Sequence, residues 1–300
     1  MRIESDKRTG YKTDCSDSIS LKNAYKEGKE ILAKAGITEA DLDAWYLLEF
    51  VTGITKARYY MDPDQSMDPE AWKKYKEYLE KRRNHIPLQH ITGSQEFMGL
   101  EFLVNEHVLI PRPDTEEWLE KIIQRYRAKG NLHVLDLGTG SGAILLSFLT
   151  YCAEADGVAV DISPEALAVA KKNAEYMKLE NRVEFRQGDF IDAVNDGELF
   201  DGVFSNPPYI PSKDIENLSE DVKHEPHMAL DGGEDGLVFY RRLAAKAGNH
   251  LKSGGFLAME VGIHQAEIVH KMMEETGEFD SFEIISDLGG IERAICCREK

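Results

Sequence analysis

The first third of the chain carries apolar residues at the spacing of helices rather than strands. We expect the second helix to begin at Thr38 as its N-cap, with Asp41 in capping-box position. Helices are expected over residues 18–36, 38–51 and 68–83. We therefore predict a small all-α domain over residues 18–92, preceded by a polar leader of residues 1–17 that shows no periodicity.

Apolar and polar residues then alternate around Met98-Gly99, which predicts a β-hairpin in the linker of residues 93–111. From residue 112 to residue 300, short apolar strands alternate with helices, the pattern of an α/β domain with a parallel sheet. Strands are expected over 132–137, 157–161, 183–187, 200–205, 255–261, 282–285 and 291–297, and helices over 141–152, 163–177, 236–251 and 264–275. The short link 287–290 implies that the last two strands pair antiparallel.

Composition fits this two-domain organisation and excludes some partners. A chain of 300 residues is at the size where single cores stop growing. The formal net charge of -18 opposes non-specific binding to nucleic acid, which depends on Lys and Arg. The four cysteines show no metal-like spacing, and the longest apolar-rich run, 142–152, is too short to span a bilayer. We expect a cytoplasmic monomer that does not bind a membrane.

The sequence Asn206-Pro207-Pro208-Tyr209 ends a buried strand in a stiff turn, because proline fixes its own φ and restricts the residue before it. Such a corner suits a planar NH2 group. Its two hydrogens would be accepted by the Asn206 side-chain carbonyl and the Pro207 main-chain carbonyl, while Tyr209 packs against its flat face. An ordinary strand-ending turn is the alternative reading of the same residues.

A glycine-rich loop, Asp136-Leu137-Gly138-Thr139-Gly140-Ser141-Gly142, follows the first strand of the larger domain and turns into a helix. Glycines there allow the backbone to approach a ligand closely. Gly138, Gly140 and Ala143 also satisfy the dinucleotide fingerprint GxGxxA, and Asp161 is placed to bind the ribose of NAD. The loop alone therefore does not choose a cofactor.

Three further features favour S-adenosylmethionine. Asp136 gives a carboxylate near the zwitterionic methionine part of that ligand, and Asp189-Phe190 offers a carboxylate and a ring that suit adenine. The corner at Asn206 lies on the same carboxyl edge of the sheet as the loop. Arg112 and a helix N-terminus also come shortly before the first strand, where a ligand could lie. Asp189 is otherwise a simple turn residue.

The loop of residues 210–234 is long enough to be a lid or a substrate-binding segment. His224 and His227 flank Glu225-Pro226 within it. Methyl transfer from a sulfonium needs no metal, and such residues are more often plain surface, so we predict no metal site.

The motifs of this chain resemble those of the HemK/PrmC family of peptide chain release factor glutamine methyltransferases. They are VLIPRPDTE at 108–116, the glycine-rich loop, NPPYI at 206–210, and the segment from Glu225-Pro226 to Gly236. The resemblance implies a class I S-adenosylmethionine-dependent methyltransferase, with a Rossmann-like sheet whose last strand is antiparallel, after an all-α domain that recognises the substrate. It further implies methylation of the side-chain amide nitrogen of the glutamine in the Gly-Gly-Gln motif of bacterial class-one release factors.

On this resemblance the site residues fall into three groups. The catalytic residues are Asn206, Pro207 and Tyr209; the cofactor-binding residues are Arg112, Thr115, Asp136, Gly138, Thr139, Gly140, Ser141, Gly142, Asp161, Ile162, Asp189, Phe190 and Asn206; and the substrate-binding residues are Asn206, Pro207, Pro208 and Tyr209.

Other functions remain open at this stage. A glutamine methyltransferase of a ribosomal protein would carry similar cofactor motifs and the same corner. A DNA adenine methyltransferase shares the Asn-Pro-Pro-Tyr turn but needs a basic cleft, which the negative charge disfavours. A non-catalytic binding module and a nicotinamide oxidoreductase are the alternatives from other classes.

Overall fold

The computed structural model describes residues 19–300, so the expected polar leader lies outside the described residues. The chain divides into two compact units, which meet between Leu88 and Gln89, a few residues before the expected boundary at residue 92. Each unit has its own core. The part that the smaller unit plays in substrate recognition stays a prediction.

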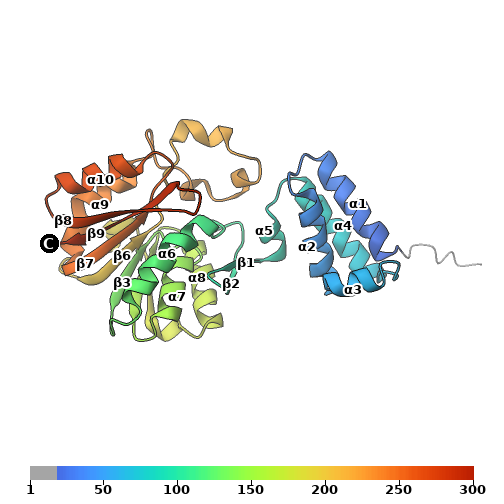
Figure 1. Cartoon of the computed structure of the whole chain (residues 1–300), viewed down its shortest axis with the longest axis horizontal. Coiled ribbons are helices and arrows are strands. Elements are labelled where there is room, and N and C mark those ends of the chain that lie inside the picture. Colours follow the sequence, from blue (N-terminus) through green and yellow to red (C-terminus); the bar gives the residue numbers. More distant parts are fainter. Residues whose placement is uncertain (1–18) are drawn as a thin grey trace, which may run out of the picture. The chain divides into compact units, whose positions relative to one another are not determined.

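The smaller unit is helical (Figure 1). Its helices are α1 (Leu21–Lys34), α2 (Ala40–Thr52), α3 (Lys56–Met61) and α4 (Pro69–Arg83). Tyr75 of α4 is fully buried, and its hydroxyl donates to the carbonyl of Ala44 in α2 over 3.0 Å. Ser20, Thr55 and Asp68 each cap a helix by accepting a backbone N–H, so most of the helix starts follow the N-cap rule.

The start of α2 differs from the expectation. Its N-cap is Glu39 rather than Thr38, and no side chain caps it. The backbone N–H of Ile37 is bound to the Leu32 carbonyl at the end of α1, so Thr38 still belongs to the turn between the helices. The carboxylate of Asp41 pairs with Lys29 at 2.6 Å instead of completing a capping box.

The larger unit contains a seven-stranded sheet in the order β5-β4-β3-β6-β7-β9-β8. The strands are β3 (His133–Leu137), β4 (Asp156–Asp161), β5 (Val183–Gln187), β6 (Phe200–Ser205), β7 (Leu251–Glu260), β8 (Phe279–Ser286) and β9 (Glu292–Glu299). Pairs from β5 to β7 are parallel, whereas β9 runs antiparallel to β7 and β8. The predicted Rossmann-like sheet with an antiparallel last strand is confirmed.

A separate hairpin precedes the sheet, as expected, although it is shorter. It consists of β1 (Ser94–Phe97) and β2 (Leu100–Leu103), and the short helix α5 (Leu88–Thr92), which the sequence did not predict, leads into it. The helices of the larger unit are α6 (Pro113–Tyr126), α7 (Ala143–Tyr151), α8 (Pro164–Tyr176), α9 (Val238–Lys246) and α10 (Ala266–Glu275).

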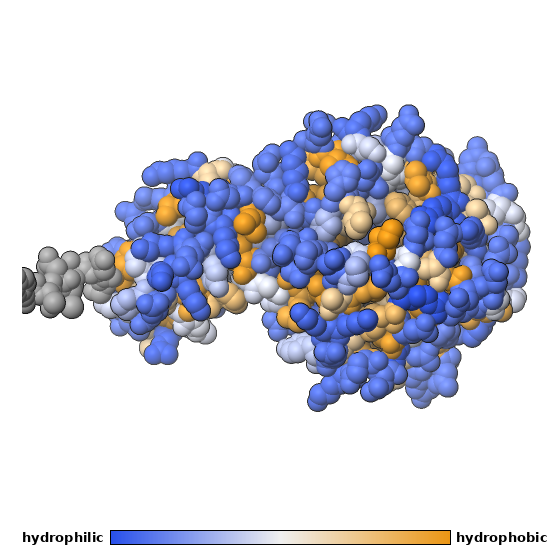
Figure 2. Space-filling view, turned by 180° about the vertical axis from the view of Figure 1, so that it is seen from behind, coloured by the Kyte–Doolittle hydropathy of each residue, from blue (hydrophilic) through white to orange (hydrophobic). Residues whose placement is uncertain are grey.

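Helices cover both faces of the sheet (Figure 1). On one face α6 and α7 pack against Val134 and Phe204, and on the other α9 and α10 pack against Leu135, Leu137 and Val203. This alternation along β3 and β6 is what a strand buried on both sides requires. Apolar groups also gather near the middle of one face of the larger unit, within a mostly hydrophilic surface (Figure 2).

The two edges of the parallel strands differ in structure. The strand order reverses at β3, because β4 and β5 lie on one side of it and β6 and β7 on the other. The connections after β3 and β6 therefore diverge to opposite faces of the sheet and leave a crevice at the carboxyl edge. At the amino edge, β7 begins with a bulge in which Lys252, Ser253 and Gly254 are exposed, and Gly254 has a φ of 76°. None of the helices within residues 19–300 is long and apolar enough to cross a membrane.

Candidate functional site

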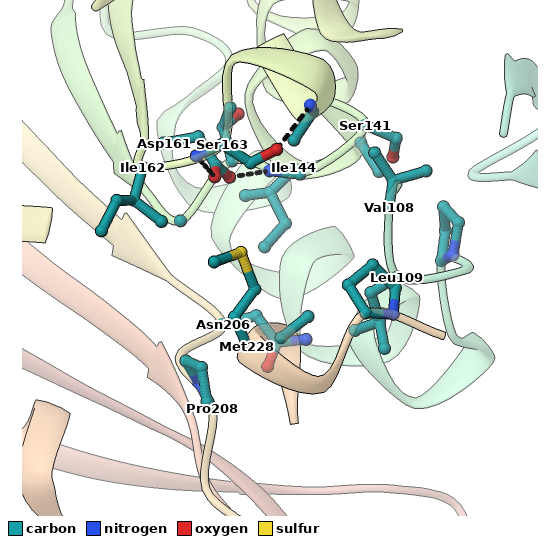
Figure 3. Close-up of a pocket in the computed structure, with 18 of the residues that line it drawn as sticks. Val108, Leu109, Ser141, Ile144, Asp161, Ile162, Ser163, Asn206, Pro208 and Met228 are labelled. Atoms are coloured by element: carbon teal, nitrogen blue, oxygen red, sulfur yellow. Dashed lines mark hydrogen bonds between the residues drawn. The ribbon is translucent and has the colours of Figure 1, made fainter. Parts of the chain in front are cut away.

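A pocket opens at the carboxyl edge of the sheet, with about 1160 Å³ of empty space including its mouth. Its walls come from the loops after β3, β4, β5 and β6, and from segments before α6 and before α9. Of the predicted site residues, it is lined by Arg112, Thr115, Gly138, Thr139, Gly140, Ser141, Asp161, Ile162, Asp189, Phe190, Asn206 and Pro208. Figure 3 shows Asn206 and Met228 on the side of the pocket opposite Asp161 and Ser163.

The glycine-rich loop has the open backbone that a closely bound ligand needs. Gly138 and Gly140 have φ values of 75° and 55°, and a Cβ at either position would meet no atom within 4 Å. Gly142 differs, because a Cβ there would lie 3.0 Å from the Leu146 side chain and 3.4 Å from Ala170. Gly142 therefore allows α7 and α8 to pack closely, and it does not line the pocket; its part in cofactor binding stays a prediction.

Asp136 lies behind this loop rather than in the pocket wall. It is 1% exposed, and its Oδ2 accepts the hydroxyl proton of Thr139 over 2.7 Å. Its Oδ1 is buried and has no partner among the described residues. Burial raises the pKa of this carboxyl to about 7, opposed by the Thr139 hydrogen bond.

Asp161 lines the pocket, and both of its carboxylate oxygens hold neighbouring backbone (Figure 3). Oδ2 accepts the Gly140 N–H over 2.8 Å, and Oδ1 accepts the Ser163 N–H over 2.9 Å. The residue thus fixes the glycine loop and the start of α8 together. Each oxygen keeps a second lone pair, so a ligand hydroxyl could still donate to it.

Asp189 is paired within the protein, which the sequence gave no reason to expect. Its Oδ1 lies 2.8 Å from Nη1 of Arg242 in α9, and its carbonyl accepts a second hydrogen bond from the same guanidinium. Arg242 also stacks over the ring of Phe190 at 5.3 Å. Phe190 has a φ of 55°, so this cluster holds a strained backbone at the rim of the pocket.

Asn206 lines the pocket directly after β6. Its Nδ2 donates to Oγ1 of Thr115 over 3.4 Å, and the Thr115 hydroxyl donates in turn to Oε2 of Glu260 over 2.5 Å. Oδ1 of Asn206 accepts no hydrogen bond in the described part of the chain. The corner therefore offers a free carbonyl oxygen, as its sequence suggested.

Glu260 ends β7 and is the buried centre of this network, with 3% exposure. The indole N–H of Trp118 donates to Oε2 over 3.1 Å, and the hydroxyl of Tyr209 donates to Oε1 over 3.4 Å. Burial raises the pKa of Glu260, against the hydrogen bonds from Thr115 and Trp118. Sequence reasoning missed this residue, although a carboxylate that ends an apolar strand is a usable signal.

The side chains of two residues of the corner, Tyr209 and Pro207, lie outside the pocket wall. Tyr209 does not line the pocket; its hydroxyl points to Glu260 and its carbonyl accepts a hydrogen bond from Gln265 over 3.0 Å. The expected packing of its ring on a bound amide is therefore not supported. Pro207 is buried, and its side chain does not line the pocket. Within residues 19–300 the Pro207 carbonyl accepts no hydrogen bond.

The loop of residues 210–234 folds back on itself and supplies Pro226, Met228 and Ala229 to the pocket wall. Glu225 anchors it, with only 2% of its side chain exposed. Its Oε2 accepts a hydrogen bond from the Ile110 N–H over 2.9 Å, and its Oε1 accepts one from Nη2 of Arg112 over 2.5 Å. One buried carboxylate thus fastens the loop to the segment before α6.

The two histidines of this loop, His224 and His227, are exposed. His227 is 69% exposed at its side chain and lies 4.0 Å from Asp231. Within residues 19–300, no group of three or more His, Cys, Asp or Glu side chains is arranged to hold a metal ion. Cys152, Cys296 and Cys297 are buried free thiols.

Family comparisons agree with the division of the chain. Residues 23–93 match the model of the PrmC N-terminal domain, and residues 128–281 match a methyltransferase domain model. A solved T. thermophilus 16S rRNA methyltransferase, in complex with AdoMet and guanosine, is 20% identical with a TM-score of 0.50. The match covers 69% of this chain and 49% of the solved chain, and it shows the fold alone.

Whole-chain relatives are more similar in sequence. A release factor glutamine methyltransferase of Moorella thermoacetica is 38% identical over 275 residues, which cover 92% of this chain and 97% of the relative. One of Geobacter sulfurreducens is 40% identical over 265 residues, which cover 88% and 91%.

Proposed function

The chain belongs to the release factor glutamine methyltransferase family, and from this premise we propose how its residues act on a substrate. It is a protein-glutamine methyltransferase. We infer that it transfers a methyl group from S-adenosylmethionine to the side-chain amide nitrogen of the glutamine in the Gly-Gly-Gln motif of class-one release factors.

The pocket fits that cofactor by several observations. The open backbone at Gly138 and Gly140 gives room for a ligand beside the main chain. Asp161 keeps lone pairs for ribose hydroxyls, and Phe190 offers an aromatic ring at the rim. The unpartnered Oδ1 of Asp136 would be satisfied by a nearby ammonium group. When bound, S-adenosylmethionine supplies a methyl group on an electrophilic sulfonium.

The free carbonyl oxygen of Asn206 is the observation that carries the proposal. An amide nitrogen is a weak nucleophile, because its lone pair is delocalised into the carbonyl. Oδ1 of Asn206 accepts one of its hydrogens, which orients the nitrogen and raises its electron density. The Pro207 carbonyl is also without a partner in the described residues and is proposed to accept the second hydrogen.

The reaction then needs no base of unusual strength. S-adenosylmethionine, held beside the glycine-rich loop and Asp161, would supply the methyl group to the amide nitrogen and leave as the thioether, and the amide proton would pass to solvent at the mouth of the pocket. Asn206 holds the nitrogen while positive charge moves onto it, and the apolar side chains of Ile144 and Met228 limit the access of water.

A labelling assay tests this function. Purified protein is incubated with S-adenosylmethionine labelled in its methyl group and with a class-one release factor, and label is expected in the peptide that contains Gly-Gly-Gln. A release factor in which that glutamine is replaced by alanine serves as the control. Label in a ribosomal protein or in duplex DNA, with none in the release factor, would contradict the proposal.

Asp136 predicts a pH dependence of cofactor binding. With a pKa of about 7, it is mostly protonated in the free protein below pH 7 and must lose its proton to meet an ammonium group. The affinity for S-adenosylmethionine is therefore expected to rise between pH 6 and pH 7 and to level off above. Calorimetry in two buffers of different ionisation enthalpy should show proton release at pH 6.5.

The Asp136→Asn protein should bind the cofactor more weakly and without this proton release. Asp287→Asn is the matched control, since the pKa of that carboxyl is lowered by its hydrogen bond with Arg293 and it lies outside the pocket. An unchanged proton release in the Asp136→Asn protein would remove Asp136 from cofactor binding.

Location and partners follow from the same proposal. Because release factors work with the ribosome, we place the protein in the cytoplasm. The release factor is the proposed protein partner, and the loop of residues 210–234 is proposed to contact it. A monomeric state stays a prediction.

A further inference from the structure

The further inference concerns the side-chain amide of Asn206 and rests on the function proposed above. A primary amide carries an acceptor oxygen on one side and a donor NH2 on the other. A half-turn of Asn206 would present its NH2 to the NH2 of the substrate glutamine, donor against donor. The protein therefore needs a device that selects one of two nearly isosteric orientations.

Thr115 supplies the local selection. Its hydroxyl has one proton, which is donated to Oε2 of Glu260 over 2.5 Å. The Thr115 oxygen can then only accept from Asn206, whose nearest atom lies 3.4 Å away. That atom must be Nδ2, because an oxygen there would find no proton.

Glu260 sets the direction of this chain of hydrogen bonds. Its side-chain partners Thr115, Trp118 and Tyr209 donate to it, and the side chain of Asn206 also forms a hydrogen bond with it. The indole N–H of Trp118 can only donate, so Oε2 is an acceptor. It therefore accepts the Thr115 proton and does not donate a proton to Thr115. Because Glu260 accepts from its neighbours, it selects the NH2 of Asn206 both directly and through Thr115.

A purely structural role explains Glu260 poorly. It is 3% exposed, and within residues 19–300 it forms no ion pair with Lys, Arg or His. A buried carboxylate without a cation is costly, and apolar residues of similar size usually serve a core better. We propose that Glu260 is a positioning residue that acts on Asn206 directly and through Thr115, and so holds the Asn206 carbonyl oxygen free for the substrate amide.

Three variants test the proposal. Thr115→Val keeps the shape of the side chain but removes the acceptor for Asn206. Glu260→Leu removes the acceptor for Thr115. Both are expected to lower kcat by about 10- to 100-fold, while the Kd for S-adenosylmethionine stays within about threefold. Glu260→Gln should restore most of kcat relative to Glu260→Leu, because Trp118 keeps the glutamine oxygen on the Thr115 side.

Tyr240→Phe is the matched control. The Tyr240 hydroxyl is buried and donates to the main-chain carbonyl of Glu260 over 3.0 Å, so the variant loses a hydrogen bond to the same residue without touching its carboxylate. Its kcat should equal that of the unmodified protein. An equal loss in Tyr240→Phe, or an equal loss in Glu260→Gln and Glu260→Leu, would overturn the proposal. A loss of cofactor affinity as large as the loss of kcat would do the same.

A measurement without substrate separates this proposal from the proposed function. The side-chain NH2 signals of Asn206 can be assigned by NMR from their absence in the Asn206→Asp protein. Their hydrogen exchange should be slow in the unmodified protein and faster in Thr115→Val. Equal exchange in the two proteins would refute the positioning role. Failure of the unmodified protein to label a release factor would refute only the function.

Discussion

Replacing Asn206 with alanine is expected to lower the kcat of methyl transfer by about 100- to 1000-fold, the range seen when one oriented polar group is removed from an active site. The variant loses the free Oδ1 that aligns the substrate amide, whereas the cofactor side of the pocket keeps Gly138, Gly140 and Asp161. The Kd for S-adenosylmethionine should therefore change by less than about threefold. Single-turnover kinetics with a labelled cofactor, together with calorimetry, measure both quantities.

Asn249→Ala is the control for this variant. Asn249 is exposed just before β7, at the amino edge of the sheet, and does not line the pocket. It should methylate at the rate of the unmodified protein. Undiminished turnover in the Asn206→Ala protein would mean that the corner does not hold the substrate amide, and the proposed mechanism would fall with it.

Replacing Glu225 with alanine is expected to destabilise the protein by about 3 kcal/mol, the lower end of the range for breaking a buried pair, because Arg112 is a third exposed and can turn to water. The N–H of Ile110 is left without its acceptor. The loop should also come loose from the pocket wall, which raises the KM for the release factor. Urea unfolding and steady-state kinetics measure the two effects.

Asp235→Ala removes an ion pair near the end of the same loop and is the control. The pair between Asp235 and Arg241 has about half of each side chain exposed, so its loss should hardly change stability. If Glu225→Ala unfolds at the same urea concentration as Asp235→Ala, then Glu225 does not anchor the loop.

The fold class and the edge that holds the pocket could be predicted because local chemistry determines them. Pro207 and Pro208 cannot continue a strand, and the glycines of the loop at 138–142 permit a backbone that few other residues adopt. Parallel strands then bring their carboxyl ends to one edge without further information.

The partners of the site residues could not be predicted in this way. Thr115 and Glu260 are 145 residues apart, and Ile110 and Glu225 are 115 apart. No periodicity or short motif links such positions; only the packing of α6 against the end of β7 brings the first pair together. The pairing of Asp189 with Arg242 is of the same kind.

The short helices and the start of α2 could not be predicted for another reason. Helices α3 and α5 have six and five residues, too few to show a helical period. The misplaced start of α2 arose because the end of α1 holds Ile37 in the preceding turn. A cap motif in the sequence is not used when neighbouring hydrogen bonds hold its residues in another conformation, as the end of α1 does here.

The bulge at the start of β7 has a practical consequence for experiments on this enzyme. Ser253 is exposed there, and its hydroxyl bonds only to the Lys300 carbonyl among the described residues. The full length of the parallel strands separates it from Asn206. The protein could therefore be labelled or attached to a surface at Ser253 without disturbing the pocket at the other end of the sheet.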